Sequence, residues 1–201
     1  MVFDPRDDAP TGAAPKTQTN VLTIATSAIA VALLWVLLFR LNQWAFSSFE
    51  VTVFITWIFL PAAIRMLAVM ACDWVGALGL FAGALFTNQT DSSEDLTDGL
   101  VLAFLSAAGA LVAFWCCTRL LRLPSNLTGL TARQLLVFAI TGAMFNAVPH
   151  NIYFYLSDRM ASPTEGLVPM FLGDLLGTVV VLYAVSFALR LMFKRKANPR
   201  L

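Results

Sequence analysis

Residues 21–39 read VLTIATSAIAVALLWVLLF, an apolar run of 19 positions without a charged side chain. About 20 consecutive apolar residues cross the roughly 30 Å hydrocarbon core of a bilayer as an α-helix. The run is long enough to span, and Arg40-Leu-Asn-Gln-Trp44 follows it in place of the small-residue cleavage site of a signal peptide. It therefore predicts a first transmembrane helix that is retained in the mature chain.

The composition extends this prediction to the whole chain. Of 201 residues, 59% are hydrophobic and 12% charged, and the mean hydropathy is +0.76, whereas soluble domains contain about 25% charged residues. Six helices of roughly 20 residues would fill this length and leave no room for a soluble catalytic domain. The net charge of +1 argues against nucleic-acid binding, which needs a basic face. We expect an all-α, polytopic transmembrane helix bundle.

Six spans are predicted from the apolar stretches, with a kink at Pro61 in the second and a break at Pro149 near the end of the fifth. The third stretch has only 13 residues and is short for a full span. An exposed acidic loop at residues 87–99 follows it. The predicted spans cover residues 21–39, 51–71, 74–86, 100–117, 135–155 and 167–193.

The distribution of basic residues predicts the orientation, because Lys and Arg concentrate on the cytoplasmic side. Six spans place ten basic residues on one side and two, Arg40 and Arg159, on the other. Merging residues 62–86 into one helix would largely remove this segregation. We expect both termini to be cytoplasmic, with a flexible tail at residues 1–20, the bundle at 21–193 and a basic tail at 194–201. The expected location is a cell membrane, taken to be the bacterial inner membrane.

Hydropathy places two charged residues, Arg65 and Asp174, inside the membrane, whereas Arg190 falls near the cytoplasmic end of the last span. A lone charge inside the membrane costs at least about 2.5 kcal/mol, so Arg65 and Asp174 each need a partner or water. We predict that they share one polar site between the second and sixth spans. Two interpretations remain open, a structural tie between these spans or a ligand or proton site.

A second polar cluster, Asn146, His150 and Asn151, surrounds Pro149. A polar pocket is one interpretation, with His150 as a ligand contact or pH sensor, and a polar cap at the membrane interface is the other. One imidazole without further ligands at suitable spacing does not predict a metal site. No metal or cofactor is expected.

The remaining motifs predict helix packing more than chemistry. Gly79 and Gly83, like Gly173 and Gly177, are four residues apart, a spacing that lets helix backbones approach closely. We expect helix crossings at both motifs, and a homo-oligomer is compatible with them. The three cysteines lack a Cys-x-x-Cys pair, and no catalytic constellation is present, so an enzyme is not expected.

Three motifs resemble those of the membrane-associated sensor domains of bacterial histidine kinases and diguanylate cyclases. They are Trp57-Ile-Phe-Leu-Pro61-Ala-Ala-Ile-Arg65, the Gly-rich Trp74-Val-Gly-Ala-Leu-Gly-Leu-Phe-Ala-Gly83-Ala-Leu-Phe-Thr-Asn88, and Leu172-Gly-Asp-Leu-Leu-Gly177. The resemblance implies sensing, with Trp57, Pro61, Arg65, Gly173 and Asp174 at the matching positions. The chain departs from the family in having Arg65 after the Pro segment and in having fewer spans.

The sequence thus predicts a sensor-like or ligand-binding membrane module that acts through a separate partner protein. The alternative is a membrane subunit of a multi-subunit importer, or an accessory subunit of a larger membrane complex. In either case the lipid bilayer surrounds the bundle, and Arg65, Asp174, Trp57, Asn146 and His150 are the expected polar core or ligand-binding residues. Pro61 and the four paired glycines are the expected packing positions.

Overall fold

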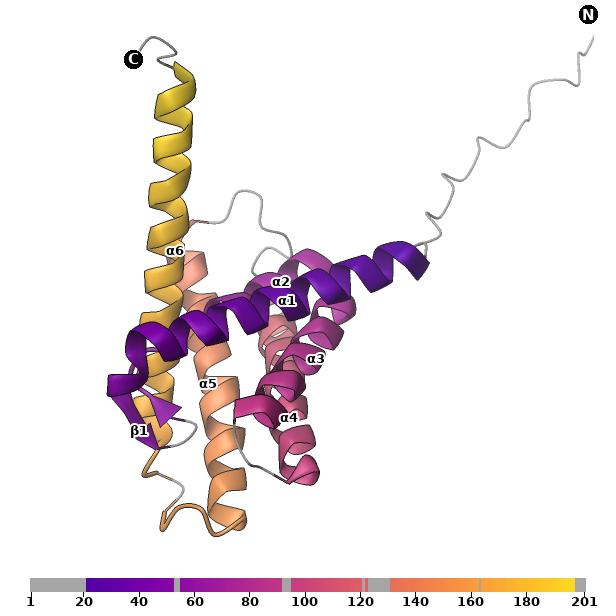
Figure 1. The fold of residues 1–201 in the computed structure, drawn as a ribbon, viewed down its shortest axis with the longest axis vertical. Helices are drawn as coiled ribbons and strands as arrows, with labels where there is room; N and C mark the ends of the chain where they lie inside the picture. Colours follow the sequence, from indigo (N-terminus) through magenta and orange to yellow (C-terminus); the bar gives the residue numbers. More distant parts are fainter. Residues whose placement is uncertain are drawn as a thin grey trace, which may run out of the picture.

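The computed structural model describes residues 21–52, 55–91, 95–120, 122, 131–162 and 164–197, and Figure 1 shows their arrangement. The predicted tail at residues 1–20 and the last four residues of the basic C-terminal tail lie outside this part of the chain. Six α-helices make up most of the rest: α1 (Val21–Phe46), α2 (Ala62–Cys72), α3 (Trp74–Asp91), α4 (Leu96–Trp115), α5 (Ala132–Leu156) and α6 (Leu167–Ala197).

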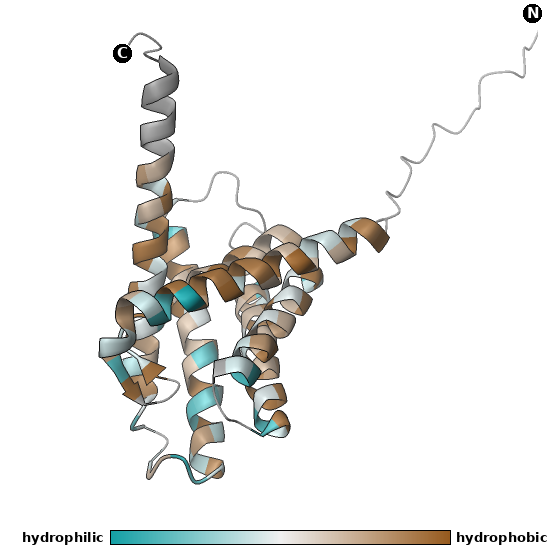
Figure 2. Cartoon of the chain, viewed as in Figure 1, coloured by the Kyte–Doolittle hydropathy of each residue, from teal (hydrophilic) through white to brown (hydrophobic). Residues whose placement is uncertain are grey.

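Four helical segments are long and apolar enough to cross a membrane. Figure 2 shows hydrophobic residues along each of the helices. The four are Val21–Phe49, Leu96–Leu120, Ala132–Leu156 and Leu167–Ala188. The prediction of a multi-pass, all-α membrane bundle is therefore confirmed. Helix α4 ends in a π-helical turn, η2 (Cys116–Leu120).

The predicted second span is wrong as a single helix. A 3₁₀ turn η1 (Ser47–Phe49) leads into a small hairpin of β1 (Glu50–Thr52) and β2 (Ile55–Thr56), and residues 57–61 lead on to the 11-residue helix α2. Pro61 does not kink this helix but stands at its N-cap with φ −61°. Proline suits a helix start because its φ is already helical and its missing N–H is not needed there.

The helix at the third predicted span is longer than expected, because α3 runs to Asp91, but it is not among the four segments that are long and apolar enough to cross a membrane. Asp73, with φ 52°, makes the turn between α2 and α3, and Gly76 of α3 lies against the backbone of Ala68. The two helices therefore form a tight helical hairpin. Since α4 begins at Leu96, the predicted acidic loop at 87–99 is shorter than expected, and residues 92–94 lie outside the described chain.

Helix α5 is not broken at Pro149, contrary to the prediction, but continues to Leu156. Proline has no N–H for the carbonyl four residues earlier, which is that of Phe145. Gly109 of α4 lies close to this carbonyl, since an added Cβ would be 2.6 Å from the oxygen. Transmembrane helices tolerate proline where neighbouring elements shelter the freed carbonyl in this way.

The two glycine motifs pack against different partners. Gly79 and Gly83 lie against α1, near the carbonyl oxygens of Ala28 and Ala32, so the predicted helix crossing is confirmed there. Gly173 and Gly177 instead face the non-helical residues 56–60, and Phe59 N donates to Gly173 O at 3.0 Å. The expected helix crossing at this second motif is therefore wrong.

Two ends of the bundle can be distinguished in Figure 1. The hairpin end carries β1, β2 and the connection from α5 to α6. The opposite end carries the turn from α2 to α3 and the start of α5. Helix α6 has 31 residues, about 46 Å at 1.5 Å per residue, and extends past the other helices at the opposite end.

Candidate ligand-binding site

The centre of the site is an ion pair inside the bundle. Arg65, in the first turn of α2, places Nη1 2.5 Å from Oδ2 of Asp174 on α6. Both residues are buried, with 5% and 2% of their surface exposed. The predicted contact between these two residues is therefore present.

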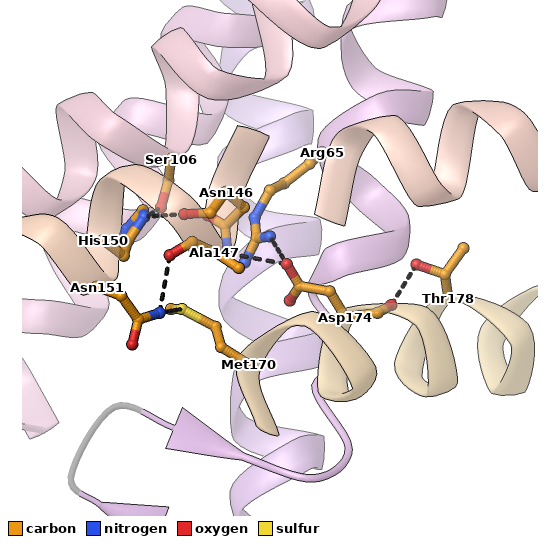
Figure 3. A network of polar contacts seen from close by, with 9 residues as sticks. All are labelled: Arg65, Ser106, Asn146, Ala147, His150, Asn151, Met170, Asp174 and Thr178. Atoms are coloured by element: carbon orange, nitrogen blue, oxygen red, sulfur yellow. Dashed lines mark hydrogen bonds and ion pairs between the residues drawn. The ribbon is translucent and has the colours of Figure 1, made fainter. Parts of the chain in front are cut away.

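Asn146 of α5 joins this pair. Its Nδ2 donates to the same Asp174 oxygen, Oδ2, at 2.8 Å, so that three helices meet at one carboxylate atom (Figure 3). Within the described chain, Arg65 Nε, Asp174 Oδ1 and Asn146 Oδ1 are buried and have no hydrogen-bond partner. Buried polar groups are partnered in most proteins, so each exception calls for an explanation.

Besides the ion pair, two aromatic rings contact the Arg65 guanidinium. Its Cζ lies 5.2 Å from the centre of the Phe59 ring and 5.7 Å from that of Trp35, within the range of cation–π attraction. Trp35 is fixed in turn, because its Nε1 donates to Oγ1 of Thr87 on α3 at 3.2 Å. Residues 57–61, through Phe59, and α1, through Trp35, thus position the same cation.

His150 of α5 forms the neighbouring wall with Ser106 of α4 (Figure 3). Its Nδ1 lies 2.8 Å from the backbone oxygen of Asn146, and because a carbonyl only accepts, Nδ1 is the donor. In the neutral imidazole this tautomer leaves Nε2 as an acceptor for the Ser106 hydroxyl, 3.3 Å away. These two contacts hold the ring of His150, which was predicted for a polar pocket, in one orientation.

Apart from Asn146, the side chains described above line a cavity of about 90 Å³. A water molecule needs roughly 10 to 15 Å³ by a comparable measure, so there is room for several waters or for a small organic molecule. From the ion pair the cavity extends toward the hairpin end, where its walls include four polar side chains: Asn42, Gln43, Glu50 and Asn88.

Four of the five predicted polar residues come together: Arg65, Asp174 and His150 line the cavity, and Asn146 lies behind them, bonded to Asp174 and to His150. Trp57 does not join them. Its neighbour Thr56 lines the cavity, but Trp57 is 40% exposed and is not part of the wall, as expected where successive side chains of an extended segment alternate in direction.

Sequence reasoning missed Trp35, Phe59, Thr87 and Ser106. Ser106 offered a usable signal, as a polar residue within the apolar run 100–117. The aromatic pair offered none, because apolar rings are common throughout the chain. Cys72, Cys116 and Cys117 are free thiols, and no group of three His, Cys, Asp or Glu residues suited to a metal occurs in the described ranges.

Comparison with protein-family models finds no match, and comparisons with curated proteins and with solved structures find none either. The resemblance to membrane-associated sensor domains therefore depends on the three motifs quoted above. Of these, the Pro61 and Gly173 motifs lie in contact with each other through residues 56–60.

Proposed function

We propose that this protein is a membrane-embedded binding module for a small polar molecule and that it acts through a separate partner protein. The observation that carries the proposal is the cavity of about 90 Å³ with the Arg65–Asp174 pair and the His150–Ser106 pair in its walls. Pockets with a few convergent polar groups in an otherwise apolar setting are typical of ligand sites.

The unpartnered atoms favour binding over a purely structural tie. A pair that served only to join α2 to α6 would be stabilised most by complete hydrogen bonding, since each buried unsatisfied group costs about 1 to 3 kcal/mol. Here three atoms around the pair lack partners. The three atoms are themselves buried, so a molecule in the cavity reaches them only when the ion pair moves, and the incomplete bonding therefore favours a site that can rearrange over a fixed tie.

Helix α6 supplies a route from this site to a partner. Asp174 and Ala197 belong to the same helix, and 23 residues correspond to about 35 Å. A ligand that binds one position of Asp174 better than another shifts the equilibrium of the whole helix by that difference in affinity. This coupling suits the sensing role that the motif resemblance implies.

The proposal includes six crossings with both termini in the cytoplasm of a bacterial cell. The second crossing consists of the hairpin, residues 57–61 and α2, in place of a single helix. The six-crossing topology is supported by the distribution of basic residues, because it places ten of them on the cytoplasmic side and two on the other side. Irregular backbone at membrane depth is tolerated where protein surrounds it. Within residues 57–61, Leu60 N donates to Oδ1 of Asn42 at 2.8 Å.

A membrane subunit of an importer is the second candidate, and one observation favours it. Arg65 lies in the first turn of α2, which begins after the non-helical residues 57–61, and transporters commonly build their substrate sites at discontinuous membrane helices. In that case the separate partner would be a transport ATPase, whereas a sensor would pair with a kinase or a cyclase.

Native mass spectrometry of the full chain in mild detergent tests the proposal. We expect a bound small molecule on the unmodified protein and its loss in Ser106→Leu, which fills the cavity. Leu176→Ala, at a 46% exposed position of α6, is the matched control and should retain the molecule. Identical spectra for all three, without a bound molecule, would contradict the binding function, and proteins that copurify would separate the two candidates.

A further inference from the structure

A second, smaller cavity lies on the other side of the ion pair. It has a volume of about 30 Å³ and is enclosed by α2, α5 and α6. Its walls are largely apolar and include Met66, Met70, Phe138 and Leu182. Met66 and Met70 lie in α2 before the turn that follows this helix, Phe138 lies near the start of α5, and Leu182 follows Asp174 in α6. The second cavity therefore extends toward the opposite end of the bundle.

Arg65 and Asp174 alone, among the described residues, line both cavities. The first cavity lies toward the hairpin end and the second toward the opposite end, so the ion pair is the partition between them. We propose that this pair is the closed gate of a pathway across the bundle, and that its separation admits small neutral molecules. The inference adds permeation to the binding cavity of the proposed function.

The closed state is poised to open because it is incompletely bonded. Arg65 Nε, Asp174 Oδ1 and Asn146 Oδ1 all lack partners while the pair is closed. Water or a polar solute in the joined cavities would supply hydrogen bonds to these atoms, which offsets part of the loss of the direct contact. The Phe59 and Trp35 rings beside the guanidinium offer it an attractive surface in the open position as well.

The charges and sizes along the route select the permeant. The Arg65 cation at the constriction disfavours cations, and the carboxylates of Asp174 and of Glu50 in the first cavity disfavour anions. The second cavity has room for only about two water molecules at roughly 10 to 15 Å³ each. A small, uncharged, hydrogen-bonding solute meets these conditions.

Urea uptake into proteoliposomes, followed by stopped-flow light scattering, tests the gate with the full chain. We expect Arg65→Ala/Asp174→Ala to raise the urea permeability about tenfold over the unmodified protein, equivalent to about 1.4 kcal/mol of barrier. Leu176→Ala should leave it unchanged. Equal permeability of the folded double variant and the unmodified protein would overturn the gate, while ligand binding in the first cavity would still support the proposed function.

A cysteine pair on α6 provides an independent measurement that keeps Arg65 and Asp174 in place. In a background with the three native cysteines replaced, Leu182→Cys lies in the second cavity and Val179→Cys, at a 56% exposed position, lies outside it. Methyl methanethiosulfonate should lower urea uptake several-fold in the first variant and leave the second unchanged. Uptake that does not respond at Leu182→Cys would overturn the pathway, including in the event that the double alanine variant fails to fold.

Discussion

Arg65 and Asp174 are 109 positions apart in the chain and are joined at 2.5 Å between α2 and α6. The contact lies where α2 begins after the non-helical residues 57–61, and it separates two cavities. Burial makes such a pair weak evidence for stability in itself, because removal of two charges from water offsets much of their attraction. Its effect on stability therefore has to be measured as a coupling.

The first prediction is that Arg65 and Asp174 are energetically coupled. Either single alanine substitution leaves one buried charge without its partner, at a cost of about 3 to 5 kcal/mol, whereas the double substitution leaves none. A double-mutant cycle on unfolding in detergent should therefore give a coupling free energy of about 1 kcal/mol or more. Additive losses, within about 0.3 to 0.5 kcal/mol, would refute the coupling.

The ion pair was predictable for a simple physical reason. Hydropathy places only Arg65 and Asp174 inside the membrane, and because each requires compensation there, the sequence favours pairing them. The hairpin before Pro61 was not predictable from the same hydropathy, because an apolar window does not distinguish a helix from an extended segment. The β-branched residues Val51, Thr52, Ile55 and Thr56 were the available signal for a strand.

The second prediction concerns Gly177, whose missing side chain makes room for the backbone at Phe59. A Cβ there would overlap the Phe59 carbonyl and come within 2.8 Å of Leu60 N. Gly177→Ala should therefore destabilise the protein by about 1 to 3 kcal/mol, as expected for overpacking. The free energy of unfolding in mixed micelles measures this loss, with Leu176→Ala as the control. Equal stability of the two variants would show that residues 57–61 do not pack on α6.

The third prediction concerns Asn42 of α1, whose Oδ1 accepts from Leu60 N at 2.8 Å. The segment has no sheet or helix partner at this N–H, so the side chain supplies the bond. Asn42→Ala should leave a buried donor unsatisfied and cost about 1 to 3 kcal/mol. Gln43→Ala, a substitution at the adjacent, partly exposed position, should cost clearly less in the same unfolding assay. The reverse order would contradict the assignment.

The aromatic part of the site shows where sequence reasoning reached its limit. Trp35 and Phe59 contact Arg65 only because α1 crosses α3 at the Gly79 and Gly83 motif and residues 57–61 pack on α6. Both approaches are tertiary properties that no local pattern contains. Trp57, the aromatic residue chosen from the motif resemblance, lies instead at an exposed position.

The last prediction is the orientation in the membrane, tested at described, exposed residues near each end of the bundle. Asp95, at the start of α4, and Arg133, at the start of α5, are both exposed. The ten-to-two distribution of basic residues places Asp95 outside and Arg133 inside the cytoplasm. Asp95→Cys should react with an impermeant maleimide in intact cells, whereas Arg133→Cys should react only after lysis, both in a background without the native cysteines.

An alkaline phosphatase fused after Leu201 should be inactive, because the enzyme requires the oxidising side of the membrane to form its disulfides. Protection of the cysteine at position 95, or an active fusion, would reverse the orientation and remove the basis for six crossings.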